Sequence, residues 1–310
     1  MAAKAKKYIG VDIGGTSIKL GIVDGRGTVL QRLEVEHITD PERGSVMERM
    51  IRGIRKLCGE EGLPISDFSG IGVSAAGCID SVKGVVAENG GNIQGWSRTP
   101  VCEKLKEEFR IPATIANDAN CAVLGEWWTG AAKGYTDVVA VTLGTGVGGG
   151  IITGGRLLEG TKGFAGEIGH FPTHAGKKEC ICGMKGCFER YASTSALIRE
   201  AGKIDPEWSS GRILFGAAAE GKTDALKLIG AWIDEVAYGI AGYVHVFNPQ
   251  LILIGGGVSR QENLLIRPLR DKVLSLIMND FTDGLEFKSA ELGNDAGIVG
   301  AVKYCLDKQQ

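Results

Sequence analysis

The sequence predicts a two-domain α/β protein with a mixed sheet in each half, and three observations support this. The chain has 310 residues, which is enough for about two domains. Runs of β-branched apolar residues alternate with helical patterns along it, as is typical of α/β layers. A glycine-rich segment at residues 11–25 has a counterpart of the same pattern at residues 141–155. We therefore expect a duplicated domain.

The elements of the first half follow from local patterns. A three-stranded meander is expected at Lys7–Ile13, Ile18–Asp24 and Val29–Val35, with tight turns between the strands. Asp40-Pro41 favours the start of a helix, because aspartate caps helices and proline fits their first position. Next come a strand at Gly70–Ala75, a helix from Thr99-Pro100, a strand at Ala113–Ala116 and a helix at Ala119–Trp128.

The second half repeats the scheme. Strands are expected at Asp137–Leu143 and Gly149–Ile152, followed by an irregular stretch to about Tyr191 and then helices. A helix at Asp224–Phe247 ends before Asn248-Pro249, since the residue before proline disfavours helical backbone. A buried strand at Leu251–Ile254 and a closing helix at Gly297–Leu306 complete the chain. The expected domains are residues 1–118 with 297–310, and residues 119–296, with a cleft between them.

Composition excludes several classes of function. A net charge of −2 gives no support for binding a polyanion such as nucleic acid. No apolar run approaches the ~18 residues that span a bilayer, and the basic start lacks a signal-peptide pattern. We expect a soluble, cytoplasmic protein that binds neither membrane nor nucleic acid. Glycine supplies 48 residues, about twice its usual share, and we interpret the excess as tight loops.

The two glycine-rich segments predict an anion site. Each places a loop of Gly and Thr between paired strands, so backbone N–H groups and a hydroxyl are presented without bulky side chains. Such concavities hold anionic oxygens. One such loop is usually just a turn, but two at matching positions favour binding of a polyphosphate.

A cysteine cluster predicts a metal site. Cys180, Cys182 and Cys187 crowd together in a chain without an export signal, which favours metal over disulfides. With a histidine they offer one imidazole and three thiolates, the ligand set of a closed, structural zinc site. His170 and His174 compete for the fourth position, and a redox-labile cysteine loop is the alternative.

Asn117-Asp118 follows a predicted strand, at the place where open α/β sheets bind ligands. A kinase that acts on a hydroxyl needs a carboxylate to accept its proton. The alternative is that Asn117 and Asp118 only cap the next helix.

Six motifs in order resemble the ROK family of sugar kinases and sugar-responsive repressors, within the actin-like ATPase superfamily of ribonuclease H-like fold. They are DIGGT at Asp12–Thr16, IANDAN at Ile115–Asn120, LGTGVGGG at Leu143–Gly150, GEIGH at Gly166–His170, CICGMKGC at Cys180–Cys187 and LILIGGG at Leu251–Gly257. The resemblance covers nearly the whole chain.

The resemblance implies a role for each matching residue. Asp118 is the general base, and the sugar contacts are Asn117, Asp118, Glu167, His170 and Glu189. Asp12 orients Mg²⁺, and the groups around ATP are Gly14, Gly15, Thr16, Gly144, Thr145, Gly146, Gly255, Gly256 and Gly257. The family spacing favours His170, Cys180, Cys182 and Cys187 as ligands of structural Zn²⁺. Asn92 is a further expected sugar contact.

The expected activity is transfer of phosphate from ATP to the 6-hydroxyl of a hexose, most simply glucose. An N-acetylhexosamine kinase, acting above all on N-acetylmannosamine, is the alternative, because Ala76 replaces a proline common in family glucokinases and Gly90 and Gly91 leave room for an acetamido group. A sugar-sensing repressor is disfavoured, since strand Lys7–Ile13 leaves no room for a helix-turn-helix before it. The family suggests a dimer or tetramer.

Overall fold

The computed structural model describes residues 6–15, 17–36, 44–88, 93 and 95–309. The chain packs into two compact units. Unit 1 comprises Met1–Lys133, Glu159–Ala165 and Asn294–Gln310, and unit 2 comprises Gly134–Leu158 and Gly166–Gly293. Unit 1 extends past residue 118, the boundary expected from the sequence, because helix α3 (Asp118–Thr129) packs against helix α9 (Ala296–Asp307).

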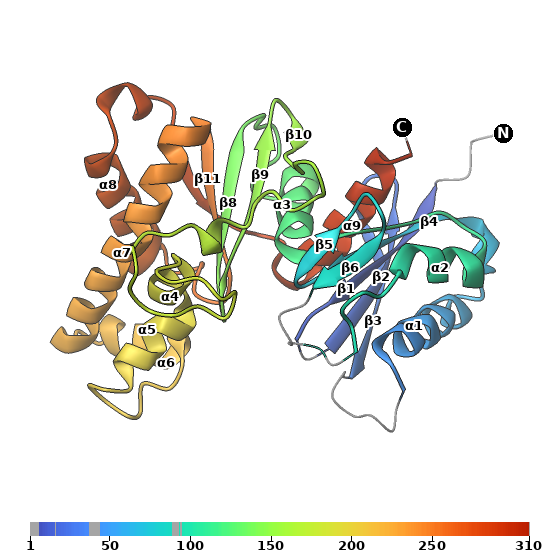
Figure 1. Cartoon of the computed structure of the whole chain (residues 1–310), viewed down its shortest axis with the longest axis horizontal. Coiled ribbons are helices and arrows are strands. Elements are labelled where there is room, and N and C mark those ends of the chain that lie inside the picture. The colour runs from blue at the N-terminus through green and yellow to red at the C-terminus, as the bar shows by residue number, and fades with distance from the viewer. Residues whose placement is uncertain (1–5, 16, 37–43, 89–92, 94, 310) are drawn as a thin grey trace. The chain divides into compact units, whose positions relative to one another are not determined.

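The sheet of unit 1 has the strand order β3-β2-β1-β4-β7 (Figure 1). Its strands are β1 (Lys7–Ile13), β2 (Ser17–Asp24), β3 (Val29–Glu36), β4 (Phe68–Ala75) and β7 (Ala113–Asn117). The first three form an antiparallel meander, and β1, β4 and β7 run parallel. A separate hairpin, β5 (Cys78–Asp80) and β6 (Val85–Glu88), was not expected from the sequence.

The sheet of unit 2 has the order β10-β9-β8-β11-β12. Its strands are β8 (Val138–Leu143), β9 (Val147–Thr153), β10 (Arg156–Leu157), β11 (Leu251–Gly255) and β12 (Glu286–Ser289). Strands β10, β9 and β8 are antiparallel neighbours, and β8, β11 and β12 run parallel. The two sheets therefore have the same order and directions, which confirms the predicted duplication and the α/β class.

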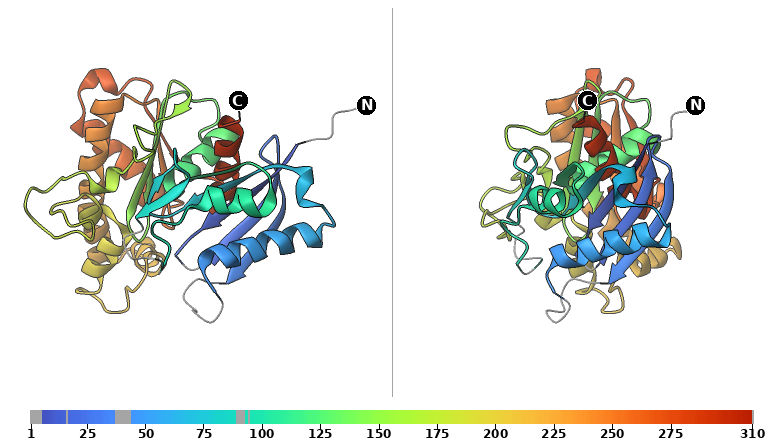
Figure 2. Two further views of the ribbon diagram at one scale, coloured as in Figure 1. Left: turned by 45° about the vertical axis from the view of Figure 1, so that its right-hand side comes forward. Right: turned by 90° about the vertical axis from the view of Figure 1, so that its right-hand side faces the viewer.

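Strand β1 contributes side chains to the cores on both faces of its sheet, because successive side chains of a strand point to opposite faces. Ile9, Val11 and Ile13 belong to the core beneath α1 (Val46–Glu60) and α2 (Val101–Phe109). Figure 2 shows α1 running along the blue strands of the meander. On the other face, Tyr8 packs with residues of α9. Asp12 shares that face, at the carboxyl end of the strand.

Glycines in the strands let α9 lie close to this face of the sheet. A Cβ atom added to Gly10 would lie 2.5 Å from the carbonyl oxygen of Ile298, and one added to Gly21 would lie 2.9 Å from the side chain of Ile298. Gly72 of β4 likewise lies against the backbone of Ala301 in α9. The prediction that the glycine excess serves tight loops was therefore incomplete, since part of it permits close packing of helix on sheet.

The described part of α1 begins at Val46 and not at the predicted Asp40-Pro41, which lies outside the described residues. Ser45 caps it with a capping box: its hydroxyl accepts from the N–H of Glu48, whose carboxylate accepts from the N–H of Ser45.

The 25-residue helix α7 (Thr223–Phe247) organises unit 2. It packs against α4 (Glu189–Ala192), α5 (Thr194–Ala201), α6 (Gly211–Ala219) and α8 (Arg267–Leu276). It ends as predicted, at Asn248 in left-handed backbone before Pro249, with the Asn248 N–H bonded to the carbonyl of Val244. Among the described residues, no helix has the length and apolar character needed to cross a bilayer.

Candidate functional site

The first glycine loop joins β1 to β2 in unit 1. The N–H of Gly14 donates to the carbonyl of Ser17 at 3.1 Å and closes the turn. A Cβ atom at Gly15 would meet nothing within 4 Å, so the loop is open on that side. Thr16, the expected hydroxyl of this loop, lies outside the described residues, as does Asn92. The loop has the open backbone that close approach of an anion requires.

Asp12 lies at the end of β1, directly before this loop. In register it pairs with Ser74 on β4 and with Lys19 on β2. The hydroxyl of Ser74 donates to Oδ1 of Asp12 at 2.6 Å. Burial raises the pKa of Asp12, while the hydrogen bond from Ser74 and the charge of Lys19 act in the opposite direction. The site thus places a partly buried carboxylate next to the first loop.

Asn117 and Asp118 join β7 to α3. The side-chain oxygen of Asn117 accepts from the N–H groups of Ala119 and Asn120, at 2.9 and 3.3 Å, so Asn117 caps α3. Its amide group donates to the carbonyl of Gly77 at 3.1 Å. Helix capping, the alternative role, therefore applies to Asn117, whose second amide hydrogen remains able to donate.

Asp118 differs from Asn117 because its side chain is exposed to solvent. The N–H of Ala119 donates to its Oδ1 at 2.9 Å. Burial of the carboxyl by the surrounding protein, and secondarily the negative charge of Asp12, raise the pKa of Asp118. Unit 1 therefore places the carboxylate of Asp12 close enough to Asp118 to affect the ionisation of Asp118.

The second glycine loop joins β8 to β9 in unit 2. The N–H of Gly144 donates to the carbonyl of Gly146 at 3.0 Å, and the N–H of Ser195, at the start of α5, donates to the carbonyl of Gly144 at 3.3 Å. A Cβ atom at Gly144 would meet nothing within 4 Å, whereas one at Gly146 would overlap the carboxylate of Glu189. Gly144 is thus open, and Gly146 is glycine because Glu189 lies against it.

The third glycine segment, Gly255–Gly257, follows β11. Gly256 has φ +96°, and a Cβ atom there would overlap the carbonyl of Leu143 at the end of β8. Gly257 is open. This turn therefore packs against the end of β8, the strand that leads into the second glycine loop of Gly144, Thr145 and Gly146.

The expected sugar residues of unit 2 lie on two short elements. Ile168–His170 forms a 3₁₀ turn, which the hydroxyl of Tyr243 holds by donating to the carbonyl of Ile168 at 2.6 Å. Glu167 before this turn is exposed, and His170 is half-buried. Glu189 begins α4, and its Oε2 accepts from the N–H of Val147 at 3.1 Å. Glu189 therefore contacts the second glycine loop as well as lying next to the cysteine cluster.

His170, Cys180, Cys182 and Cys187 come together as the sequence predicts. Their ligand atoms all lie within 4.8 Å of one another. Nδ1 of His170 is 3.6 Å from the sulfur of Cys180, and the sulfurs of Cys182 and Cys187 are 3.6 Å apart. Burial and the two neighbouring thiols raise the pKa of Cys187 to about 12, whereas hydrogen bonds from the backbone of Met184 and from the neighbouring thiols outweigh burial and lower the pKa of Cys182. A bound cation would displace the thiol protons of the cluster. One imidazole with three thiols fits Zn²⁺.

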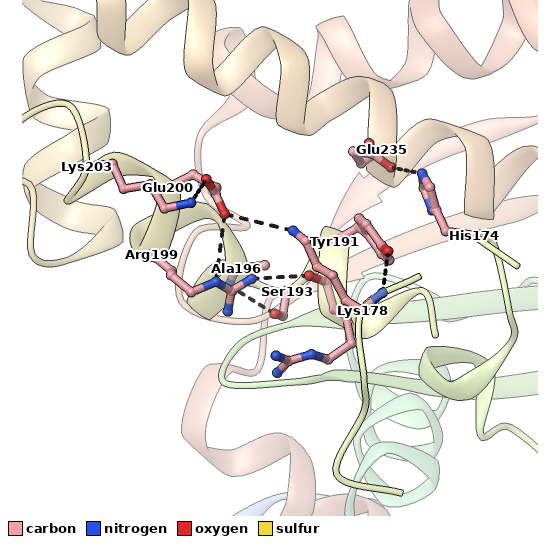
Figure 3. A network of polar contacts seen from close by, with 10 residues as sticks. His174, Lys178, Tyr191, Ser193, Ala196, Arg199, Glu200, Lys203 and Glu235 are labelled. Carbon is pink, nitrogen blue, oxygen red and sulfur yellow. Dashed lines mark hydrogen bonds and ion pairs between the residues drawn. The ribbon is translucent and has the colours of Figure 1, made fainter. Parts of the chain in front are cut away.

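His174, the competing ligand, is engaged elsewhere (Figure 3). Its Nδ1 lies 3.0 Å from the hydroxyl of Thr173, and its Nε2 lies 3.5 Å from the carboxylate of Glu235 on α7. Its ring stacks on Tyr191 at 3.9 Å. The ammonium of Lys178 also lies over the Tyr191 ring, 4.7 Å from its centre. Among the described residues, it is His170 whose ring nitrogen lies with the three cysteine sulfurs.

Sequence reasoning missed three residues around Asp12. Ser74 and Lys19 flank it across the sheet, and a Cβ atom at Gly297 of α9 would lie 2.5 Å from its Cγ. A predicted strand register would have indicated Lys19, because β2 was expected to pair with β1. Ser74 gave no such signal, because the sequence did not show that β4 lies next to β1. The close approach of α9 gave no signal, since Gly297 is far from Asp12 in the sequence.

Comparison with known proteins places this site in a family. The sequence profile of the ROK family matches residues 8–308. A glucokinase of Thermotoga maritima is 36% identical to this chain, over 97% of this chain and 98% of its own length. A solved ROK family glucokinase from Streptomyces griseus, in complex with glucose and AMPPNP, is 32% identical with a TM-score of 0.83, over 97% of this chain and 99% of that one.

A third relative bears on the choice of sugar. A solved protein from Listeria monocytogenes, described as a candidate N-acetylmannosamine kinase, is 27% identical with a TM-score of 0.82. The match covers 98% of this chain and 100% of that one. These solved relatives share the actin-like ATPase fold with this chain. Because the family profile spans residues 8–308 and the duplicated sheets agree with it, the chain belongs to the ROK family.

Proposed function

We propose that this chain is an ATP-dependent hexose kinase that phosphorylates glucose at the 6-hydroxyl. The observation that carries the proposal is the pair of carboxylates in unit 1: Asp118, exposed at the start of α3, and Asp12, at the edge of the open first glycine loop. Phosphoryl transfer to an alcohol needs one carboxylate to accept a proton and another near the metal and phosphates.

Asp118 is the general base. The oxygen of the sugar 6-hydroxyl attacks the γ-phosphorus, its proton passes to the carboxylate of Asp118, and ADP leaves. The raised pKa of Asp118 suits this role, because a base is most effective when its pKa approaches the working pH. Its exposed side chain leaves the carboxylate accessible to a substrate. Asn117 then orients the segment as the cap of α3 and offers its remaining amide hydrogen to the sugar.

Asp12 and the glycine loops hold the nucleotide. Asp12 has one oxygen bonded to Ser74, and its second oxygen can orient Mg²⁺ or the waters bound to it. Mg²⁺ neutralises charge on the β- and γ-phosphates. At Gly15 and Gly144 no protein atom covers the position of a Cβ, so phosphate oxygens can approach the backbone N–H groups. Gly257, also open, fits a role beside the adenosine.

Glu167, His170 and Glu189 recognise the sugar. A carboxylate accepts and an imidazole both donates and accepts, which suits ring hydroxyls. Because Nδ1 of His170 faces the sulfur of Cys180, Nε2 is the nitrogen available to the sugar. Glu189 lies within 3.9 Å of Cys180 through its other oxygen. The cysteine cluster would thereby fix the residues that contact the sugar.

Zn²⁺ is the metal we propose for that cluster. His170, Cys180, Cys182 and Cys187 would hold it, and four protein ligands leave no position for substrate, so the metal is structural. Its contribution is to order residues 170–189, which lie apart from regular secondary structure except for short turns and bridges.

Glucose is favoured over N-acetylmannosamine. The sequence identity to the Thermotoga glucokinase is 36% over 97% of the chain, whereas the identity to the Listeria protein is 27%. AMPPNP, bound with glucose in the Streptomyces griseus structure, is an analogue of ATP, and this supports ATP as the donor.

The direct test incubates the purified chain with ATP, Mg²⁺ and glucose. ADP should form only when sugar is present, and ³¹P NMR of the product should show coupling to the protons on C6. ADP formation that does not depend on any sugar would contradict the proposal.

A further inference from the structure

Ser74 is a buried hydroxyl that the proposed reaction does not use. It lies on β4, has no exposed surface, and pairs in register with Asp12 on the parallel strand β1. Its hydroxyl oxygen is 2.6 Å from Oδ1 of Asp12. A distance this short is typical of a hydroxyl that donates to a charged carboxylate.

The carboxylate of Asp12 sets the direction of this hydrogen bond, because an ionised carboxylate can only accept. Ser74 therefore donates to Asp12. Cys121, fully buried on α3, lies beside Ser74. Burial, and next the charge of Asp12, raise the pKa of Cys121 well above its ordinary value, so its thiol stays neutral next to this pair.

The backbone of α9 confines Asp12 from another side. A Cβ atom at Gly297 would lie 2.5 Å from Cγ of Asp12 and 2.6 and 2.8 Å from its two oxygens. The carboxylate is therefore held between the start of α9 and Ser74, with little freedom to rotate. Within the described part of the chain, Ser74 is the one side chain that donates a hydrogen bond to Asp12. If the hydroxyl is removed, Oδ1 loses this partner.

We propose that Ser74 is a positioning residue for the reaction: it holds Oδ1 of Asp12 and so aims Oδ2 at the Mg²⁺ that accompanies ATP. The inference rests on the proposed role of Asp12. Ser74 touches neither substrate nor nucleotide in this account, and it acts only through Asp12.

A purely structural role for Ser74 makes a different prediction. If Ser74 only satisfied a polar group in the core, its loss would lower thermal stability and leave the dependence on Mg²⁺ unchanged. If Ser74 positions Asp12, the Mg²⁺ concentration that gives half-maximal activity must rise. Binding of AMPPNP should also lose part of its enhancement by Mg²⁺, which is a readout that does not depend on turnover.

The experiment compares Ser74→Ala, Ser74→Thr, Cys121→Ala and Asp12→Asn in the full chain. We expect Ser74→Ala to raise the half-saturating Mg²⁺ concentration and to lower kcat. The ratio of kcat to that Mg²⁺ concentration should fall by about 10- to 100-fold, the range of a hydrogen bond to a charged group. The KM for glucose should change little. Ser74→Thr keeps the hydroxyl and should restore the Mg²⁺ dependence. Cys121→Ala is the matched control, because it removes a buried side chain beside Ser74 and keeps the Ser74 hydroxyl. It should lower the melting temperature and change the half-saturating Mg²⁺ concentration by less than threefold.

The Asp12→Asn variant separates this inference from the proposed function. If Asp12→Asn abolishes Mg²⁺-dependent AMPPNP binding but Ser74→Ala leaves it unchanged, the positioning role of Ser74 is refuted and that of Asp12 stands. If Asp12→Asn itself leaves Mg²⁺ dependence unchanged, the role of Asp12 is wrong, and the inference fails with it. Should Ser74→Ala not fold, Ser74→Cys, which keeps the size but donates poorly, replaces it with the same expected result.

Discussion

Oε2 of Glu189 accepts a hydrogen bond from the backbone N–H of Val147, at 3.1 Å. The same carboxylate lies against Gly146, and its other oxygen is 3.9 Å from the sulfur of Cys180. One side chain therefore links the second glycine loop to the cysteine cluster. The loop and the cluster are separate motifs in the sequence, but in unit 2 they share a residue.

Gly144 and Gly146 should respond differently to substitution. Gly146→Ala places a methyl group on the carboxylate of Glu189, so we expect a loss of about 1–3 kcal/mol in the free energy of unfolding. Gly144→Val meets open space and should leave the melting temperature within a few degrees of wild type, yet its branched side chain should raise the KM for ATP by about tenfold or more. Thermal melts and ATP kinetics on both variants test this. An unchanged KM for ATP in Gly144→Val would contradict the role of the loop.

Asp118→Asn keeps the shape of the side chain and removes the proton acceptor. We expect kcat to fall by about 10²–10⁴-fold, with the Kd for glucose little changed. The amide oxygen can still accept from the N–H of Ala119, so α3 should remain intact. Near-wild-type turnover would exclude Asp118 as the base. Asp67→Asn, at an exposed position of unit 1 with no proposed role, is the control.

Stability should depend on pH through Asp118 and Asp12. Folding raises the pKa of both carboxyls above the ordinary value of 3.8. Their contribution to stability is therefore fully present below pH about 3.8 and is lost as the pH rises through the raised pKa values. Asp118→Asn should accordingly melt at a higher temperature than wild type at pH 7, and this difference should shrink as the pH is lowered toward 4. Melting curves from pH 4 to 8 measure it, and a difference that grows on acidification would reverse the assigned sign.

His174, which lies near the cysteine cluster without belonging to it, offers a matched control for the zinc prediction. Metal analysis should find about one zinc per chain. Cys182→Ser should lose this metal and lower the melting temperature, whereas His174→Gln should retain it, since His174 faces Thr173 and Glu235. Purified, active wild-type protein without zinc would refute the site. Loss of zinc from His174→Gln would instead show that the ligand assignment is wrong.

Much of the fold could be predicted because local signals agreed with the packing. The β-branched run of β1 and the glycine turn after it predicted the first hairpin, and the same pattern predicted β8 and β9. Strand β12 was missed, since Glu286–Ser289 mixes charged and apolar residues at the edge of its sheet. Helix α8 was missed because polar and apolar residues are mixed along it and few of its residues are buried.

The candidate site divides in the same way. The metal ligands could be predicted because cysteines are rare and their spacing is short. Ser74 could not, because an isolated serine in a buried strand has no local signature, and its role depends on which strand lies next to β1. Gly146 was assigned to phosphate approach alone, whereas the structure shows that it also makes room for Glu189. In both cases the decisive contact joins residues that are far apart in the sequence, so no local pattern indicates it.

A panel of sugars measured by ADP release decides whether this chain is a hexose kinase and which hexose it prefers. With saturating ATP and Mg²⁺, glucose should give a kcat/KM at least ~10-fold above that of N-acetylmannosamine, which is about 1.4 kcal/mol of transition-state discrimination. An N-acetylated hexosamine that exceeds glucose would overturn the choice of sugar and leave the kinase intact. The absence of sugar-dependent ADP release with glucose, mannose and N-acetylmannosamine would contradict the assignment as a sugar kinase.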